Sequence, residues 1–458
     1  MIYQIIHIMS ALVPFKKNHV IEKSTLEKKT VLLITSSGGT GHLQAAKAQI
    51  AKTQRENPHA YIIQKDILID WLGNFLGRSF VLMWNRCQKK GHHKALRFFS
   101  SQTPIADLIF WPYVFCNTLS TILSQDVDHI IDTQFIGTSP IIKAIKIARK
   151  LTNKPLILEK VLTELPTDHI AHLLKPIKSL SSPDRTLIKL ISTSPPLLQQ
   201  GQTAEAFWQR YCGLSETEVC YQDLPLRPHF AKLYDRSQHP KQKLHIQIKV
   251  KNAIEKFIVT DTIKKGNLQS DTNQDYIAIT IEPEDRVATI LLGSQPTEKA
   301  TIQYVKKFID IIHRTAHAQK RHLLFVFCNN YAEPRNSLLR RVHAVIQQAS
   351  FYPSCLNIIP MCFQDDEVIA TLYQRSNATF TRSGGLTSME LLAVAQGQIW
   401  IHSEVKQKQA TNEELAKGMP VWEKGNALYL QQTRGAKFIT PATFFDTCID
   451  YFLPESTA

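Results

Sequence analysis

The 458-residue sequence lacks the cysteine spacings that build metal sites and disulfide frameworks. Its eight cysteines form no C-x-x-C pair and no cluster with histidine, and several stand in apolar surroundings, as Cys328 does after 325–327. We therefore expect buried free thiols in a reducing compartment, with no metal site.

Long hydrophobic runs are also missing, since no apolar stretch reaches the ~20 residues of a membrane-spanning helix. Residues 1–15 are apolar, but they have no preceding basic residue and no small-residue cleavage site, which is not typical of a signal peptide. We assign residues 1–30 to an N-terminal extension and predict a cytoplasmic protein, peripherally associated with the membrane for the reason that follows.

Acidic residues are scarce: 39 against 54 Lys and Arg, a net charge of +15 that favours anionic partners. Region 71–106 has no acid at all, and its basic residues alternate with aromatic ones such as Phe75, Trp84 and Phe98. This mixture predicts contact with an anionic membrane surface. The alternative is a solvated helix with a core stripe.

What is present is an alternation of short apolar runs with helical stretches. The strand-like runs are residues 31–35, 61–64, 129–132 and 155–162, and then 287–292, 323–327, 356–359, 378–381 and 399–402. This rhythm indicates parallel βαβ units in an α/β protein with doubly wound sheets. The chain length predicts two domains.

The alternation breaks between the two halves. Residues 243–251 alternate apolar and polar with period two, as in a half-exposed strand, and 276–281 is a candidate partner strand. We predict a first domain at 31–230, a linker and β-rich insertion at 231–286, and a second domain at 287–458.

A first glycine-rich loop, TSSGGTGH, follows the strand 31–35. It is no P-loop, because His42 stands where a lysine is required, and Gln44 breaks the dinucleotide pattern. The loop still allows a ligand close to the backbone through Gly38, Gly39, Thr40 and Gly41. His42, at the start of a helix, is suited to act as a general base, the alternative being an incidental surface histidine in a capping loop.

A second glycine-rich loop, TRSGGLTSME, follows the strand 378–381 and opens a helix. Free backbone amides at a helix N-terminus suit a diphosphate. Glu390, further along this helix, is placed to accept hydrogen bonds from both hydroxyls of a ribose. The alternative is a helix start without a ligand.

At this second loop the sequence resembles glycosyltransferase family 28, which includes the peptidoglycan N-acetylglucosaminyltransferase, monogalactosyldiacylglycerol synthases and processive diacylglycerol glucosyltransferases. Residues 382–390 are similar to the R-S-G-(small)-L-T-x-x-E motif of that family, and residues 38–42 resemble its N-terminal loop ending in histidine. Residues 224–230, 293–295 and 163–165 are similar to three further segments, in the family's order.

The resemblance implies a GT-B architecture, in which two Rossmann-like domains face each other across a cleft. A UDP-sugar donor would lie on the second domain, held without metal or cofactor. The donor-binding residues it implies are Gly293, Ser294, Gln295, Phe363, Arg382, Ser383, Gly384, Gly385, Leu386, Thr387, Glu390, Gln409 and Asn412. Phe363 would border the uracil, and Gln409 and Asn412 would contact the sugar.

The resemblance further implies an inverting transfer of a hexose or N-acetylhexosamine to a lipid or lipid-linked acceptor, with His42 as base. Glu164 would orient His42 or the acceptor, unless it is a surface acid. Arg227, on the acceptor side, is either a diphosphate counter-charge or a structural ion-pair partner.

Two other functions remain as alternatives. A UDP-sugar epimerase shares this architecture but requires several acids converging in the cleft. A non-catalytic protein binding nucleic acid or membrane would explain the charge. However, it leaves both glycine loops without a ligand, and no nucleic-acid-binding module is recognisable in the sequence, so we expect no nucleic-acid partner.

Overall fold

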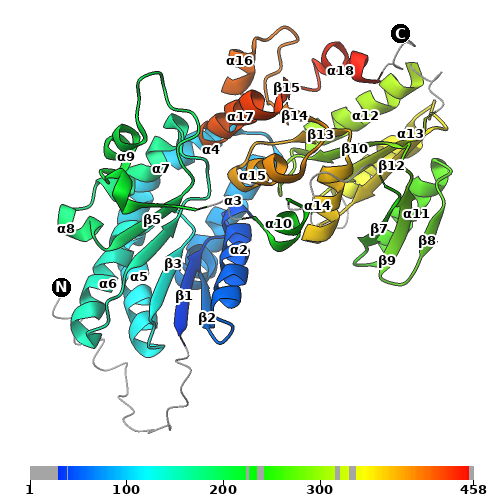
Figure 1. The fold of residues 1–458 in the computed structure, drawn as a ribbon. Helices are drawn as coiled ribbons and strands as arrows, with labels where there is room; N and C mark the ends of the chain where they lie inside the picture. Colours follow the sequence, from blue (N-terminus) through cyan, green and yellow to red (C-terminus); the bar gives the residue numbers. More distant parts are fainter. Residues whose placement is uncertain are drawn as a thin grey trace.

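The computed structural model describes residues 29–38, 40–222, 226–234, 242–314, 320–329 and 337–452. The predicted extension up to residue 28 and Gly39 of the first glycine loop lie outside the described residues. Figure 1 shows two lobes, one coloured blue to green from the first half of the chain and one green to red from the second.

The N-terminal domain contains a six-stranded sheet in the order β2-β1-β3-β4-β5-β6, with every pair parallel. Almost every side chain of β1, which lies between β2 and β3, is buried, as expected for a parallel sheet covered on both faces. The strands are β1 (Thr30–Thr35), β2 (Tyr61–Asp66), β3 (His129–Asp132), β4 (Leu158–Val161), β5 (Ile188–Ser192) and β6 (Val219–Tyr221).

The helices of this domain connect successive parallel strands, as the predicted βαβ units require. Between β1 and β2 runs α2 (Thr40–Glu56), and between β3 and β4 runs α6 (Thr138–Thr152). The other α-helices described in this domain are α3 (Arg78–Lys89), α4 (His93–Ser101), α5 (Thr103–Ser124), α7 (Ala171–Lys178), α8 (Ser182–Arg185) and α9 (Ala204–Cys212). Short turns are η1 (Ile67–Trp71), η2 (Gly73–Gly77), η3 (Asp168–Ile170) and η4 (Glu216–Glu218).

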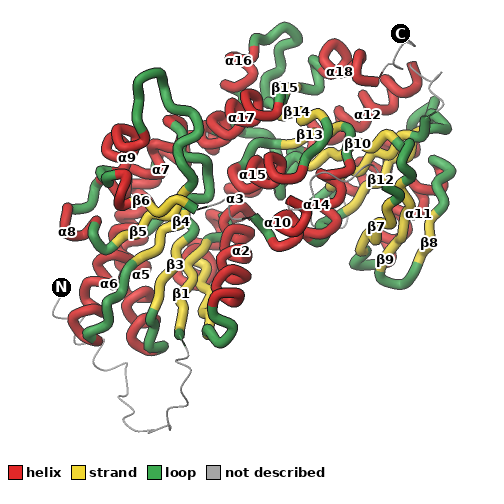
Figure 2. The backbone as a smooth tube through the Cα atoms, in the orientation of Figure 1, coloured by secondary structure: helices red, strands yellow, loops and turns green. Residues whose placement is uncertain are grey.

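The C-terminal domain contains a second six-stranded parallel sheet, in the order β12-β11-β10-β13-β14-β15. Numbered within the domain this is 3-2-1-4-5-6, the order of the Rossmann fold. The strands are β10 (Arg286–Leu291), β11 (His322–Phe327), β12 (Leu356–Met361), β13 (Ala378–Thr381), β14 (Gln398–His402) and β15 (Lys437–Ile439). Figure 2 shows both sheets flanked by helices. The predicted α/β class with two doubly wound domains is confirmed.

The helices of the second domain are α12 (Glu298–Arg314), α13 (Leu338–Gln348), α14 (Asp366–Arg375), α15 (Gly385–Val394), α16 (Asn412–Lys417), α17 (Val421–Arg434) and α18 (Phe444–Phe452). One of them crosses between the domains: α17 packs on α15 and also on η3 of the N-terminal domain. The two domains therefore share a helix-mediated interface.

The predicted insertion is a mixed module and not simply β-rich. Its strands β7 (Leu244–Lys249), β8 (Ser270–Thr272) and β9 (Tyr276–Ile281) form an antiparallel sheet in the order β7-β9-β8. The predicted pairing of 243–251 with 276–281 is confirmed, with Leu244 opposite Ile281. Helix α11 (Ala253–Lys265) was missed, because its apolar face consists of β-branched residues that also favour strands.

The module belongs to the core of the second domain. Ile246, Ile248 and Ile277 join the same buried cluster as Leu323 and Phe325. The predicted domain end at 230 also needs correction, because α10 (Pro228–Tyr234) packs against α14 and α15, with Phe230 in that cluster.

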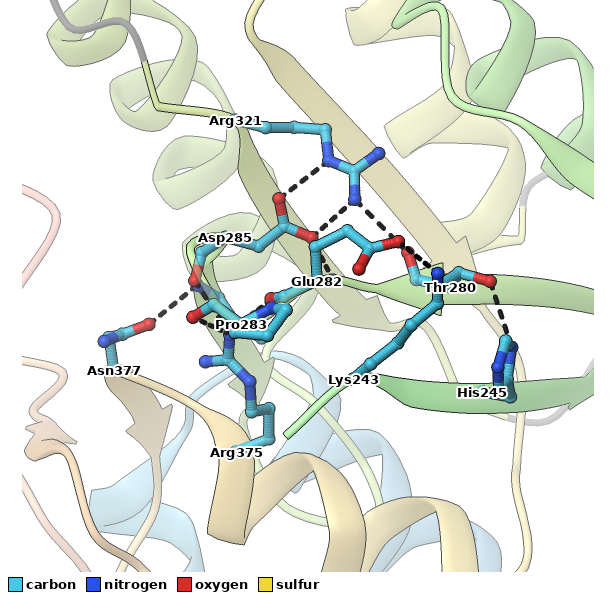
Figure 3. Close-up of polar contacts among 10 residues, drawn as sticks. Lys243, His245, Thr280, Glu282, Pro283, Asp285, Arg321, Arg375 and Asn377 are labelled. Atoms are coloured by element: carbon cyan, nitrogen blue, oxygen red, sulfur yellow. Dashed lines mark hydrogen bonds and ion pairs between the residues drawn. The ribbon is translucent and has the colours of Figure 1, made fainter. Parts of the chain in front are cut away.

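A polar joint fixes the passage from β9 into β10 (Figure 3). The carboxylate of Asp285 accepts hydrogen bonds from Arg321 Nε and Nη2 at 2.8 and 2.6 Å. Arg375 Nη2 donates to three carbonyls of the turn, those of Glu282, Pro283 and Asp285. The turn from the insertion into β10 is thus held by Arg321, which precedes β11, and by Arg375, the last residue of α14.

Candidate functional site

A cavity of about 320 Å³ lies between the two domains. It is bordered by the segments that follow β1, β10 and β13. In the first sheet the strand order reverses between β1 and β3, and in the second it reverses between β10 and β13. Ligands of open α/β sheets bind at such switch points, outside the carboxyl ends of the strands. Two doubly wound domains facing one cavity form the predicted GT-B architecture.

Most of the predicted site residues line this one cavity. They are Gly38, Gly41, His42, Glu164, Arg227, Gly293, Ser294, Gln295, Phe363, Arg382, Gly384, Gly385, Leu386, Thr387 and Glu390. Ser383 is buried directly behind the cavity wall, and Thr40 begins α2. Residues from both domains, between positions 38 and 390, thus border the same cavity, as the sequence predicted for a two-domain site.

His42 stands in the first turn of α2 and lines the cavity. Its Nδ1 lies 2.7 Å from the carbonyl oxygen of Thr133. Because a carbonyl has no proton to donate, Nδ1 carries the proton and Nε2 of the neutral ring is a free acceptor. Burial, reinforced by the positive charge of Lys160, lowers the pKa of His42. The imidazole is therefore neutral at neutral pH, with Nε2 able to accept a proton.

A buried charge pair lies behind His42. Lys160 Nζ is 2.7 Å from Asp132 Oδ2 and 3.0 Å from Thr138 Oγ1, and both charged residues are almost fully buried. This pair was not predicted from the sequence, although a lysine inside a buried strand was the available signal. The pair fixes the ends of β3 and β4 beneath the first loop.

The second glycine loop presents a helix N-terminus to the cavity. Helix α15 begins at Gly385, and its N-cap, Gly384, makes no side-chain cap hydrogen bond. Gly384 has no side chain that could cap the helix, and the Gly385 amide is hydrogen-bonded to the Glu164 carboxyl. Because the helix dipole adds positive potential there, this end of α15 suits an anion such as a phosphate.

Glu423 of α17 anchors this loop from outside. Arg382 Nη2 donates to Glu423 Oε1 at 2.6 Å, and Ser383 Oγ donates to the Glu423 carbonyl at 2.9 Å. Arg382 is therefore committed to an ion pair. In this structure Arg382 holds the second loop in position and does not supply a free positive charge to the cavity.

Glycine is required at two points of the cavity wall. A Cβ at Gly385 would overlap the carbonyl oxygen of Thr163 and lie 2.6 Å from Glu164 Oε2, so the second loop abuts the N-terminal domain here. Gly293 has a φ of +78°, in the left-handed region that favours glycine. Both residues match the family motifs that predicted them.

Arg227 and Glu390 form one buried ion pair. Arg227 Nη2 donates to Glu390 Oε2 at 2.7 Å, Nε donates to Oε1, and Nη1 donates to Asp366 Oδ1 at 2.6 Å. Of the two roles considered for Arg227, the structure shows the ion-pair partner. Its assignment to the acceptor side is corrected, because both partners belong to the second domain. The ribose contact of Glu390 stays a prediction, since each carboxylate oxygen has a further lone pair.

Glu164 borders the cavity but makes no hydrogen bond to His42 in the part of the chain that the structure describes. Its Oε2 accepts a hydrogen bond from Asn426 Nδ2 at 2.6 Å. Burial raises the pKa of Glu164 to about 8, and Glu423 adds to the increase. The interpretation as a plain surface acid is excluded, whereas its role toward an acceptor stays a prediction.

Gln409 and Asn412 are both exposed and do not line the cavity. A capping box of Thr411 and Glu414 starts α16 and leaves Asn412 on the solvent side of the first turn. The structure thus does not support the predicted sugar contacts. Glu404 of the same segment is instead turned inward, accepting from Thr297 Oγ1 at 2.7 Å.

Phe363 lines the cavity on a loop that the insertion holds in place. The side chain of Gln364 accepts from Lys249 N at 2.9 Å and donates to Lys249 O at 3.0 Å. Glu255, fully buried, accepts from Cys362 N at 3.3 Å. The backbone conformation around the predicted base-binding residue is therefore set partly by β7 and α11.

An aromatic wall on the N-terminal side was missed at the sequence level. Phe80 stacks on Trp84 with ring centroids 6.0 Å apart, and Trp84 stacks on Trp422 of α17 at 5.8 Å. All three line the cavity, together with Leu68, Phe99, Phe135 and Leu173. Trp422 carried no signal in the sequence, because only the fold brings α17 against α3.

Four polar atoms of cavity-lining residues are buried without a hydrogen-bond partner within the described residues. They are Gln44 Oε1, Trp84 Nε1, Thr163 Oγ1 and Asn329 Oδ1. Such atoms are costly unless something bonds to them.

Charge inside the cavity is already balanced. Among its described lining residues the lysine and arginine side chains are those of Arg227 and Arg382, and both are ion-paired with glutamates. No group of three His, Cys, Asp or Glu side chains in the described ranges is placed to hold a metal ion. The unpaired positive potential at the cavity therefore comes from backbone amides.

No protein-family model and no curated protein matches the sequence. Solved structures do match. The MurG structure from Acinetobacter baumannii is 11% identical, with 93% of this chain and 89% of that chain covered and a TM-score of 0.41. The UDP-GlcNAc 2-epimerase from Neisseria meningitidis, bound to UDP-GlcNAc, is 8% identical, with 92% and 98% covered and a TM-score of 0.40.

A glycosyltransferase structure from Rickettsia africae ESF-5 is 11% identical, with 94% of this chain and 100% of that chain covered and a TM-score of 0.36. With scores this low, the assignment of the fold rests on the strand order of the two sheets. Membership of glycosyltransferase family 28 stays a prediction from the sequence motifs.

Proposed function

We propose that this protein is a glycosyltransferase that moves a hexose or N-acetylhexosamine from a UDP-sugar to a lipid or lipid-linked acceptor. The observation that carries the proposal is one cavity bordered by a neutral histidine with a free Nε2 and by the N-terminus of α15. A base and an anion-binding helix end facing each other are the two parts that transfer from a diphosphate requires.

In the proposed reaction, Nε2 of His42 takes the proton of the acceptor hydroxyl. The acceptor oxygen then bonds to the anomeric carbon as the bond between that carbon and the diphosphate oxygen breaks, with inversion. The leaving UDP keeps the electron pair, and the amides of residues 384–387 stabilise its added charge. These amides take the place of a metal ion, so the reaction as proposed needs no metal and no cofactor.

The donor lies on the second domain in this proposal. Glu390, oriented by Arg227, accepts from the ribose hydroxyls through its remaining lone pairs. Phe363 borders the uracil, and Gly293, Ser294 and Gln295 border the diphosphate from the β10 side.

The acceptor side supports a lipid. Its wall is aromatic and aliphatic, and both cavity arginines are already paired. Outside the cavity, α3, α4, α5 and the preceding turn expose Phe75, Leu82, Phe98, Ile105, Leu108 and Ile109. The exposed basic residues Arg78, Arg86, Lys90, Lys94 and Arg97 accompany them. This combination suits adsorption to an anionic membrane.

Two findings bear on how the protein would reach a membrane. The structure splits region 71–106, because Phe80, Trp84 and Phe99 border the cavity while Phe75 and Phe98 face solvent. No helix of the described residues is both long and apolar enough to traverse a bilayer. We therefore propose peripheral attachment through the exposed part of this region, with the cavity opening near the bilayer surface.

The epimerase alternative is less well supported. The glutamates that line the cavity are Glu164, Glu390 and Glu423, and each accepts a strong hydrogen bond from a neighbouring side chain. A reaction that depends on several free acids therefore has no evident set of residues among those described.

A donor screen tests the proposal. Purified protein is incubated with UDP-glucose, UDP-galactose, UDP-N-acetylglucosamine or GDP-mannose and with total lipid extract, and nucleotide release and lipid glycosylation are measured. We expect one UDP-sugar to give lipid-dependent UDP release, and His42→Ala to abolish it. Absence of both binding and turnover with every donor would overturn the proposal.

A further inference from the structure

Asn426 joins the segment that follows β4 to the second glycine-rich loop. It is fully buried in α17, and its Nδ2 donates to Glu164 Oε2 at 2.6 Å and to the Ser383 carbonyl at 2.9 Å. Its Oδ1 accepts from Leu165 N at 3.2 Å. Glu164 and Leu165 follow β4 of the N-terminal domain, whereas Ser383 follows β13 of the second domain. One amide thus connects both.

Two glycines make this close approach possible. A Cβ at Gly425 would overlap Thr167 Oγ1, and a Cβ at Gly385 would overlap the Thr163 carbonyl. Segment 163–167 therefore packs directly against the backbone at Gly385 and Gly425, in addition to its hydrogen bonds with the Asn426 side chain. Contacts of this kind are sensitive to small displacements, because packed interfaces switch between discrete arrangements.

Asn426 itself does not line the cavity, but its hydrogen-bond partner Glu164 does. Glu164 and Gly385 border the cavity, and Ser383 precedes the amides at the start of α15. The same helix also holds the second loop through Glu423. A displacement of residues 383–385 by a bound diphosphate would thus be transmitted through Asn426 to residues 163–165.

We propose that Asn426 is a positioning residue, which couples donor binding on the second domain to the placement of the acceptor domain over it. This inference rests on the function proposed above. Its contribution is made through Glu164, Leu165 and Ser383, without contact to donor or acceptor. Loss of the amide should therefore reduce turnover while leaving nucleotide affinity nearly unchanged.

The experiment compares Asn426→Ala with Gln432→Ala, which removes an exposed amide from the same helix. The radius of gyration of the ligand-free protein is measured by small-angle X-ray scattering, UDP affinity by calorimetry, and kcat with the donor from the screen. For Asn426→Ala we expect a larger radius of gyration, a UDP Kd within about twofold of the parent, and a kcat lower by on the order of 100-fold. Gln432→Ala should match the parent in all three.

Asn426→Asp covers the case in which the alanine variant does not fold. It keeps the side-chain volume but replaces the Nδ2 donor by an oxygen facing the Glu164 carboxyl and the Ser383 carbonyl. We expect the same expansion and the same loss of kcat. If a folded Asn426 variant binds UDP and keeps the parent radius of gyration and kcat, the role of Asn426 is overturned. If the parent protein binds no UDP, it is the proposed function that is overturned.

Discussion

The guanidinium of Arg227 donates to both oxygens of Glu390, and the two side chains are buried beside the cavity. The orientation of Glu390, the predicted ribose ligand, therefore depends on Arg227, which lies 163 positions earlier in the chain. The carboxylate that resembles the family's ribose ligand has its orientation fixed before any nucleotide arrives.

Removal of Arg227 should therefore destabilise the fold. Arg227→Ala leaves Glu390 buried and unpaired, which we expect to reduce the free energy of unfolding by about 3–5 kcal/mol. Chemical denaturation measures this change. The control is Arg341→Ala, which breaks the exposed pair with Glu298 and should cost about 0–1 kcal/mol. Equal, small losses for both variants would contradict the importance of the buried pair.

Substitution of His42 should separate transfer from binding. His42→Ala removes the proton acceptor, so we expect turnover to fall by about 100- to 10,000-fold while UDP affinity changes little. Steady-state kinetics and calorimetry measure the two quantities. An active alanine variant would assign the first glycine loop to structure alone.

The pH dependence of turnover follows from the lowered pKa of His42. The neutral ring accepts the proton, and the folded-state pKa lies below the ordinary value of 6.5, so the base stays active as pH falls to 6.5. We expect the rate to decline only at lower pH. Burying a neutral histidine also means that stability is lost as pH falls through this range. An acidic limb centred above 6.5, measured under saturating donor, would be inconsistent with the described geometry.

Gly385 should tolerate no side chain. Gly385→Ala forces a Cβ onto the Thr163 carbonyl, and we expect a loss of about 1–3 kcal/mol of stability or a displaced domain contact. Gly384→Ala is the control for stability, because nothing lies within 4 Å of the added Cβ and φ is −60°. Thermal unfolding of both variants tests the closeness of the two loops.

Membrane adsorption should depend on the exposed residues of the N-terminal domain. Phe75→Ser combined with Leu108→Ser removes side chains that are 85% and 75% exposed. Each would contribute about 1.5–3 kcal/mol if fully inserted into lipid. Flotation with acidic vesicles should show a marked loss of binding for this variant.

The matched control is Phe351→Ser, which removes a phenylalanine 69% exposed on the second domain and should leave binding unchanged. Binding of the parent protein should be stronger to acidic than to neutral vesicles and should weaken with added salt. Negligible binding of the parent to both kinds of vesicle would rule out this surface.

The parts of the site that sequence predicted are local. Residues 36–42 and 382–390 each place glycines between a buried strand and a helix, so neighbouring residues alone determine a loop that can approach a ligand. Strand periodicity similarly predicted β1 to β4 of the first sheet and β10 to β14 of the second, but it missed β5, β6 and β15. Helix α11 was missed because Ile258, Val259 and Ile263 satisfy strand and helix patterns alike.

The parts that sequence did not predict depend on contacts between distant segments. The contacts of Asn426 and Trp422 form only because α17 packs on η3. Lys160 is placed beside Asp132 only by the pairing of β4 with β3. Gln409 and Asn412 lie away from the cavity for a different reason. The resemblance identifies residue types but does not determine the local backbone. Here the capping box at Thr411 sets the start of α16 and with it the direction of these side chains.

The stack of Trp84 on Trp422 has a practical consequence. It places two of the six tryptophans of the chain face to face, one from each domain. Indole emission responds to the polarity and neighbours of the ring, so opening of the interface should change the intrinsic fluorescence. Intrinsic tryptophan fluorescence can therefore report the separation of the two domains without an added label. Trp422→Phe identifies the part of the signal that comes from this pair.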